Sequence, residues 1–199
     1  MRILVAGATG LTGMRLVKEL CERGHEPIAL VRSSSDTSGL PDTVETRLGD
    51  LADLDESVTE GCEVVIFAAG SGGDTSAEMT DKIDRDGAIR LIELSEKSDV
   101  RRFVMLSTVG AGDPDPQSEL AHYLKAKQAA DERLKKSDLE IAILRPVSLT
   151  KQGASGDVRL GENVDPKGEA ARGDVAVLLA DAAEQDRWIG RVSLMETVG

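Results

Sequence analysis

The sequence RILVAGATGLTG, residues 2–13, decides the fold of this chain. Arg2–Ala6 is a short apolar run, and a segment with glycine at every third residue, 7–13, follows it directly. Residues 14–23 then have the apolar spacing of a helix. Strand, glycine turn and helix in this order form the context that a dinucleotide-binding loop requires. The glycines let the backbone turn tightly and approach a diphosphate, which then faces the N-terminus of the helix.

Apolar runs alternate with helix-like stretches along the whole chain of 199 residues. The runs are continuous, which is typical of strands buried on both faces of a parallel sheet. We therefore predict one α/β domain over residues 1–199, a Rossmann-type doubly wound parallel sheet. The expected strands are Arg2–Ala6, Pro27–Arg32, Val44–Leu48, Glu63–Ala69, Arg102–Ser107 and Glu140–Arg145, with Arg191–Glu196 closing an edge. The expected helices are Leu11–Arg23, Leu54–Glu60, Thr80–Lys97, Glu119–Lys136 and Asp174–Gln185.

Composition and charge narrow the class of protein. Aromatic residues make up only 2% of the chain, so the core must be aliphatic. The formal charge of −12 argues against nucleic acid and anionic membranes as partners. It fits either adaptation to high salt or an ordinary acidic protein, two readings that thermal melts with and without molar KCl would separate.

Cysteine usage and hydropathy indicate the compartment. Cys21 and Cys62 are expected to be free thiols of a reducing cytosol, and no Cys/His cluster has the spacing of metal ligands. No apolar run approaches the roughly 20 residues of a membrane span. The first apolar run is a strand followed by a glycine turn rather than a secretion signal, so we expect a cytoplasmic protein without a bound metal.

The residues after the second strand indicate the type of dinucleotide. A site for NAD usually has a carboxylate here, which binds a ribose hydroxyl. This chain has Arg32 and Ser33, and a guanidinium can pair with the 2′-phosphate of NADP. We therefore predict NADP(H) rather than NAD(H). Two interpretations compete with this one: Arg32 is a solvated loop residue, or Asp36 binds the ribose of NAD.

Two further strand ends are candidates for the adenosine half of the site. Asp50 and Leu51 follow the third strand, where a carboxylate can accept from the adenine amino group or cap the next helix. The segment 68–70, Ala-Ala-Gly, follows the fourth strand. Its small residues either let the backbone pass close to the ribose or form a simple turn.

Candidate catalytic residues come from the second half of the chain. Its one tyrosine, Tyr123, lies four residues before Lys127, so a helix would place both on one face. Ser107, with Thr108 as a substitute, ends the fifth strand, where active-site groups of such sheets gather. A nearby ammonium and the nicotinamide would lower the tyrosine pKa from about 10 and allow acid–base catalysis. The same pair can also occur on an exposed helix without a function.

These motifs, with Leu144 to Val147, occur in the order found in short-chain dehydrogenases/reductases. The chain most resembles the atypical branch, the NAD(P)-binding, NmrA-like and sugar-epimerase-like proteins of the NAD-dependent epimerase/dehydratase superfamily. The resemblance implies a catalytic trio of Ser107, Tyr123 and Lys127. It implies that the cofactor is bound by Gly7, Thr9, Gly10, Leu11, Thr12, Gly13, Arg32, Ser33, Asp50, Leu51, Ala68, Ala69, Gly70, Tyr123, Lys127, Pro146, Val147 and Ser148.

The expected function is an NADP(H)-dependent oxidoreductase that transfers hydride to or from a small carbonyl or alcohol substrate. A non-catalytic NADP(H) sensor and a nucleotide-sugar epimerase or dehydratase are the alternatives. Loops at 71–80 and 147–172, the second with a short strand inside, are expected to shape the substrate pocket. The chain is expected to act as a monomer or homodimer, and its sequence does not name the substrate.

Overall fold

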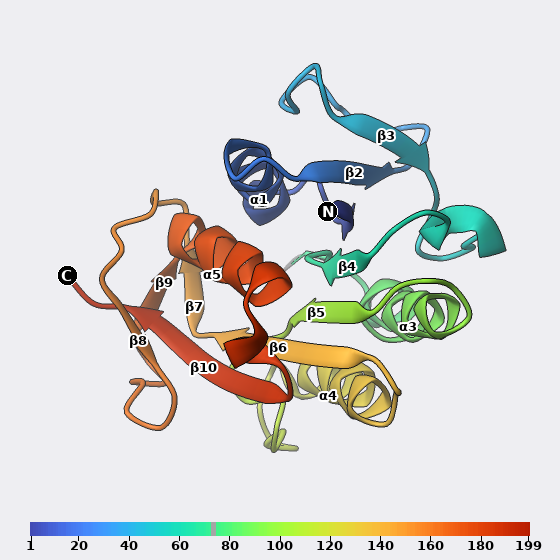
Figure 1. Cartoon of the computed structure of the whole chain (residues 1–199). Helices are drawn as coiled ribbons and strands as arrows, with labels where there is room; N and C mark the ends of the chain where they lie inside the picture. Colours follow the sequence, from blue (N-terminus) through green and yellow to red (C-terminus); the bar gives the residue numbers. More distant parts are fainter. Residues whose placement is uncertain (73–74) are drawn as a thin grey trace.

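An eight-stranded sheet runs through the molecule, and helices cover both of its faces (Figure 1). The computed structural model describes residues 1–72 and 75–199. Neighbouring strands are parallel except for the last pair, which is antiparallel. Their spatial order is β3 (Glu45–Leu48), β2 (Glu26–Val31), β1 (Arg2–Ala6), β4 (Val64–Phe67), β5 (Arg102–Leu106), β6 (Glu140–Pro146), β10 (Arg191–Thr197) and β8 (Val158–Leu160). This order, reversing between β1 and β4, confirms the Rossmann-type doubly wound sheet.

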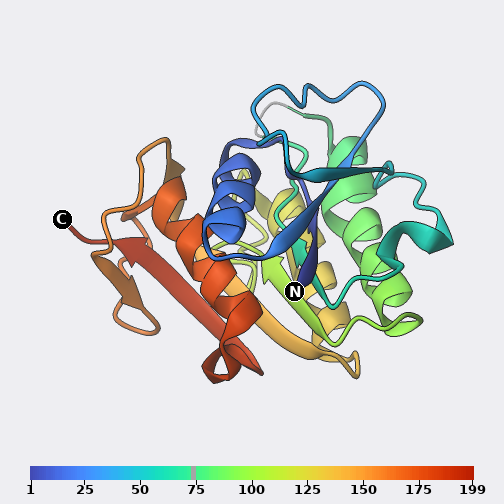
Figure 2. The same ribbon diagram turned by 45° about the horizontal axis from the view of Figure 1, so that its top comes forward.

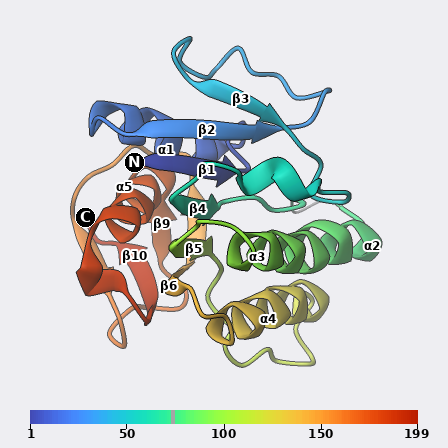
Figure 3. The same ribbon diagram turned by 45° about the vertical axis from the view of Figure 1, so that its right-hand side comes forward.

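Helices lie on opposite faces of the sheet (Figure 3). The helices α1 (Leu11–Glu22) and α5 (Arg172–Glu184) pack together on one face. The other face carries α3 (Ala88–Glu96) and α4 (Ala121–Lys135). The remaining elements are short: a helical turn α2 (Ala77–Thr80), a π-helical segment η2 (Asp81–Gly87), 3₁₀ turns η1 (Glu56–Thr59) and η3 (Asp186–Trp188), and a separate parallel pair of strands, β7 (Ser148–Thr150) and β9 (Glu169–Ala171).

Each face of the sheet has its own aliphatic core. Successive side chains of a strand point to opposite faces. In β1, Ile3 and Val5 accordingly pack with α1 and α5, and Leu4 and Ala6 pack with α3. All four side chains are fully buried, as the continuous apolar run predicted.

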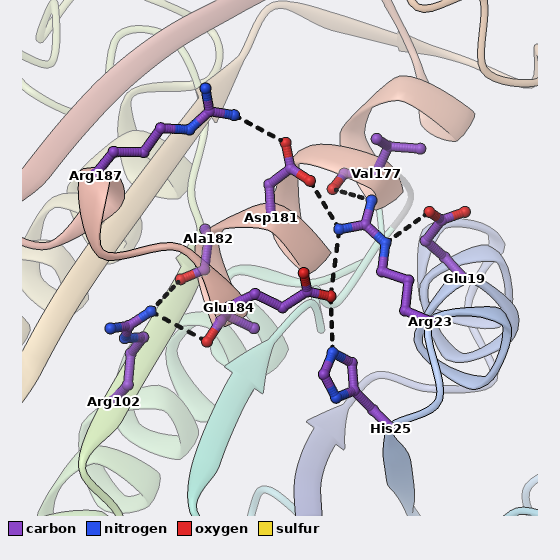
Figure 4. A network of polar contacts seen from close by, with 10 residues as sticks. Glu19, Arg23, His25, Arg102, Val177, Asp181, Ala182, Glu184 and Arg187 are labelled. Atoms are coloured by element: carbon purple, nitrogen blue, oxygen red, sulfur yellow. Dashed lines mark hydrogen bonds and ion pairs between the residues drawn. The ribbon is translucent and has the colours of Figure 1, made fainter. Parts of the chain in front are cut away.

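Polar contacts hold α1 against α5 on one face (Figure 4). The guanidinium of Arg23, just after α1, donates to Asp181 of α5 at 2.7 Å and to Glu19 at 2.8 Å. His25 contacts Glu184 through Nε2 and Oε1 at 2.7 Å. These contacts fix the first helix, and with it the glycine turn, relative to the last helix.

Two strand predictions were wrong in detail. The segment Val44–Leu48 was expected to be buried on both faces, but β3 is an edge strand beside β2 alone and Leu48 is 73% exposed. Arg47, in this strand, donates to the carbonyls of Val58 and Glu60. The segment after the strand therefore contacts β3 through these hydrogen bonds. At the other end, β10 pairs on both sides, and β8 from the expected loop region closes the edge.

Helix predictions differ at two places. Within Leu54–Glu60 only the single turn η1 forms. Asp55 caps its start by accepting from the Ser57 N–H, and Gly61, with a φ of +66°, follows its end. The predicted helix Thr80–Lys97 begins earlier, at Ala77, and passes through η2 before it reaches α3. The segment 147–172 contains three short strands, where one was expected.

Candidate functional site

A cavity of about 850 Å³ opens at the carboxyl ends of the strands, where doubly wound sheets bind ligands. Residues that follow five parallel strands line it, and α4 and α5 add further side chains. The volume lies within the usual range of roughly 300–1,000 Å³ for a small-molecule site. Of the residues predicted from the sequence, the lining includes Gly7, Thr9, Gly10, Leu11, Thr12, Arg32, Asp50, Leu51, Ala68, Ala69, Gly70, Ser107, Tyr123 and Lys127.

The glycine turn between β1 and α1 has a shape that larger residues would destroy. Gly7 has a φ of +83°, and a Cβ there would lie 2.6 Å from the backbone N of Ala69. A Cβ on Gly13 would overlap the carbonyl oxygen of Gly7, so α1 packs directly on the turn. Gly13 therefore supports the cavity from outside its lining.

The N-terminus of α1 has no competing negative charge. Gly10, its N-cap residue, provides no side-chain hydrogen bond, and the first turn contains no acidic residue. Backbone N–H groups at such a helix end bind phosphates. The backbone cradle and this helix end therefore fit the diphosphate of a dinucleotide.

One part of the cavity, predicted to hold the adenosine, is lined by residues of the loop 32–44, which projects from the sheet between β2 and β3 (Figure 2). Arg32 lines the cavity and has an exposed side chain, and its backbone N–H donates to Ser35 Oγ at 3.0 Å. Ser35 lines the cavity in the place that was predicted for Ser33, which is exposed. Asp50 Oδ1 accepts from the Ala52 N–H at 2.9 Å, so this carboxylate shapes its own turn as well as the cavity wall.

The predicted catalytic trio meets at one end of the cavity. Ser107 follows β5, and Tyr123 and Lys127 project from α4. The ammonium of Lys127 is buried, donates to the Leu106 carbonyl at 2.9 Å and lies 5.5 Å from the centroid of the Phe67 ring. Two elements, β5 and α4, thus contribute the trio to one cavity, with Ser107 sixteen residues before Tyr123.

Two buried carboxylates, which the sequence analysis missed, surround this trio. Asp131 is fully buried and accepts from the Ser107 hydroxyl at 2.8 Å and from Arg145 at 2.8 and 3.0 Å, all through Oδ2. Asp84, in η2, is also fully buried and lies 3.8 Å from Lys127 Nζ. The Ser107 hydroxyl therefore presents lone pairs to a ligand, since its proton is already donated.

The electrostatics of Tyr123 differ from the expectation. Burial, followed by the charges of Asp84 and Asp131, raises the pKa of Tyr123 to about 12. The expected lowering by Lys127 was wrong for the protein alone, because that ammonium is itself buried between the carboxylates. Burial also lowers the pKa of Lys127, although Asp84 and Asp131 oppose this effect.

The segment Pro146–Ser148, predicted to contact the cofactor, is absent from the described lining of the cavity. The Pro146 carbonyl accepts from the Val109 N–H, Val147 donates to the Met195 carbonyl, and Ser148 belongs to β7. Leu149, the next residue, lines the cavity instead.

Some lining residues could have been found from the sequence and others could not. Asp131 lies four residues after Lys127, so the helical spacing that joined Tyr123 to Lys127 also predicts it. Arg172, His122 and Leu149 carry no such pattern.

The described residues contain no group of three or more histidine, cysteine or acidic side chains able to hold a metal ion. Within the same part of the chain, no helix is both long and apolar enough to cross a membrane.

Fold and site together define a Rossmann domain that binds NAD(P)H, of the atypical short-chain dehydrogenase/reductase type. Comparison with known proteins agrees: the chain belongs to the NAD(P)H-binding family, whose model matches residues 7–186. The chain is 33% identical over 182 residues to the uncharacterized sugar epimerase YhfK of Bacillus subtilis. The alignment covers 88% of this chain and 85% of that protein.

Solved structures extend this agreement over the whole chain. A protein from Bacillus halodurans, provisionally named an NAD-dependent epimerase/dehydratase, superposes with a TM-score of 0.93 at 35% identity, covering 100% of this chain and 94% of that one. The oxidoreductase ylbE from Lactococcus lactis superposes with a TM-score of 0.88 at 28% identity, covering 100% and 91%. The chain is therefore a member of an oxidoreductase-like and epimerase-like family.

Proposed function

We propose that the protein is an NADP(H)-dependent oxidoreductase that acts on a small carbonyl or alcohol substrate. The observation that carries this proposal is that Gly7, Arg32, Tyr123 and Lys127 line the same cavity. A dinucleotide laid along it would have its diphosphate at the glycine turn and its nicotinamide near the tyrosine. This is the arrangement that hydride transfer requires.

The preference for NADP(H) rests on Arg32. Within the described residues no carboxylate lies within 4.0 Å of its guanidinium, which leaves that group available to a 2′-phosphate. Asp36, the candidate ribose ligand for NAD, is exposed and accepts from the Ser38 N–H at 3.0 Å. It is absent from the described lining of the cavity.

The chemistry of reduction assigns a role to each residue of the trio. When bound, NADPH would supply the hydride for the carbonyl carbon and would leave as NADP⁺. Tyr123 donates its phenolic proton to the carbonyl oxygen, which completes the alcohol. The charge of Lys127, one helical turn away, offsets part of the charge of the phenolate left behind, although it does not outweigh burial and the two carboxylates. Ser107 accepts a hydrogen bond from the new hydroxyl. With a pKa of about 12, Tyr123 holds its proton at neutral pH, so the proton is present for donation.

Substitution of the tyrosine tests the proposal. We expect Tyr123→Phe to lower turnover by at least about 100-fold, the scale of a lost general acid, with little change in NADPH affinity. Turnover is followed at 340 nm with a panel of small carbonyl compounds. Lys125→Met, an exposed change on the same helix, serves as the matched control and should leave turnover unchanged. Equal turnover in Tyr123→Phe and the unchanged protein would remove the phenol from the mechanism.

A second candidate, an NADP(H) sensor without catalysis, is favoured by the internal bonds of the trio. Ser107 donates to Asp131 and Lys127 donates to a backbone carbonyl, so both groups have partners inside the protein. Tight NADPH binding with no oxidation of NADPH across the panel would favour the sensor. Interconversion of nucleotide sugars without net change at 340 nm would favour an epimerase, the name that one relative bears.

A further inference from the structure

Arg172 occupies an unusual position at the wall of the cavity. It is the first residue of α5, and it lines the cavity beside the glycine turn. Its Nη1 donates to Thr12 Oγ1, in the first turn of α1, at 2.8 Å. Its Nε is buried and has no hydrogen-bond partner among the described residues. A buried N–H of a cation without a partner is costly, and a ligand that accepts from it would remove that cost.

The charges around Arg172 also favour an anion. Although the chain carries a net charge of −12, no carboxylate of the described residues lies within 4.0 Å of this guanidinium. Its charged neighbour is a second arginine, Arg15, which donates to the carbonyls of Leu11 and Lys151. Burial, and then the charge of Arg15, lower the pKa of Arg172. The cation is therefore held in an unfavourable environment next to the place where a phosphate would lie.

We infer that Arg172 and the N-terminus of α1 form one anion site, which binds the diphosphate of the dinucleotide from two sides. The glycine turn supplies backbone N–H groups, and Arg172 supplies the positive charge that this turn lacks. Thr12 holds the guanidinium in place through its hydroxyl. This inference rests on the proposed function and adds a residue from the opposite end of the chain.

Three ligands distinguish a contact of Arg172 with the diphosphate from a contact with either end of the cofactor. NADPH contains all parts, 2′-phospho-ADP-ribose lacks the nicotinamide, and adenosine 2′-monophosphate lacks the diphosphate. We expect Arg172→Gln to raise the Kd of the first two about ten- to 100-fold, the scale of a charged hydrogen bond, measured by isothermal titration calorimetry. The Kd of adenosine 2′-monophosphate should change less than about twofold, since it has no contact with Arg172.

Arg15→Gln is the matched control, because it removes a neighbouring guanidinium that is not among the residues described as lining the cavity. It should leave all three constants within about twofold. Arg172→Lys keeps the charge, so its Kd values for NADPH and 2′-phospho-ADP-ribose should lie between those of Arg172→Gln and the unchanged protein.

Several results would overturn the inference. Unchanged NADPH binding in Arg172→Gln would remove Arg172 from the site, and loss confined to NADPH would assign it to the nicotinamide. Equal weakening of all three ligands would show that Arg172 does not act on the diphosphate in particular. An unchanged protein that binds no dinucleotide would overturn the proposed function as well, which distinguishes the two failures.

Discussion

The phenol of Tyr123 is controlled by groups that a sequence motif does not contain. Asp84 comes from a π-helical segment and Asp131 from the next turn of α4, and both are fully buried. Burial is the largest cause that raises the pKa of the phenol to about 12, and these two carboxylates add to it, so the phenol holds its proton at neutral pH. A dinucleotide with a positively charged nicotinamide would act in the opposite direction.

Titration of the phenol tests this picture directly, because Tyr123 is the only tyrosine in the chain. We expect its absorbance change near 295 nm to have a midpoint of about 12 in the folded protein. In denaturant the midpoint should fall to about 10, the ordinary value of tyrosine. Addition of NADP⁺ should move the folded midpoint downward. Half-ionised Tyr123 at pH 10 in the folded protein alone would show that neither burial nor the carboxylates raise its pKa.

At the scale of elements, α4 depends on the buried pair of Asp131 and Arg145. We expect Asp131→Asn to lower the free energy of unfolding by about 3 kcal/mol, because Arg145 then keeps a buried charge without its partner. Urea denaturation at neutral pH measures the change. Glu132→Gln, the next residue, loses only an exposed pair with Lys135 and should cost less than about 1 kcal/mol. Similar costs for the two variants would show that the buried pair does not stabilise α4.

The contacts between α1 and α5 predict a loss of stability in acid (Figure 4). Burial opposes ionisation of Glu184, but hydrogen bonds and charges from His25 and Arg23 outweigh it and lower its pKa below the ordinary 4.5. A lowered pKa stabilises the fold above about pH 4.5 and ceases to do so as the pH falls through the folded value.

Glu184→Gln should therefore cost about 1 kcal/mol at pH 7, and this difference should shrink toward pH 3. The free energy of unfolding is compared at both values. Glu22→Gln, on the exposed side of α1, is the control and should show a smaller difference that does not depend on pH in this way. A difference that grows in acid would contradict the assignment.

The local sequence pattern predicted the strands that are buried along their whole length and the glycine turn that follows the first of them. Continuous apolar runs identified the buried strands, and the glycine spacing identified the turn before α1. The same reasoning failed for Val44–Leu48 and Leu54–Glu60, because burial of an edge strand and the length of a short helix depend on distant neighbours. The trio of Ser107, Tyr123 and Lys127 could be predicted from spacing, whereas Arg172 meets Thr12 only after the chain has folded across 160 residues.

At the scale of the whole molecule, one cavity joins the two ends of the site. Unpaired guanidinium groups gather there in an otherwise acidic chain: within the described residues, Arg32 and Arg172 both line the cavity without a carboxylate partner. We expect this local positive charge to hold the phosphates of a ligand at the carboxyl edge of the sheet, in a chain whose net charge is −12.

Calorimetric titration of the protein with NADPH and with NADH tests the central claim most directly. The account predicts saturable binding at one site per chain, with a Kd for NADPH at least about tenfold lower than for NADH. Arg32→Gln should remove most of that difference, and Ser34→Ala, an exposed change nearby, should preserve it. The account would be contradicted by a protein that binds neither dinucleotide, or one that binds NADH more tightly.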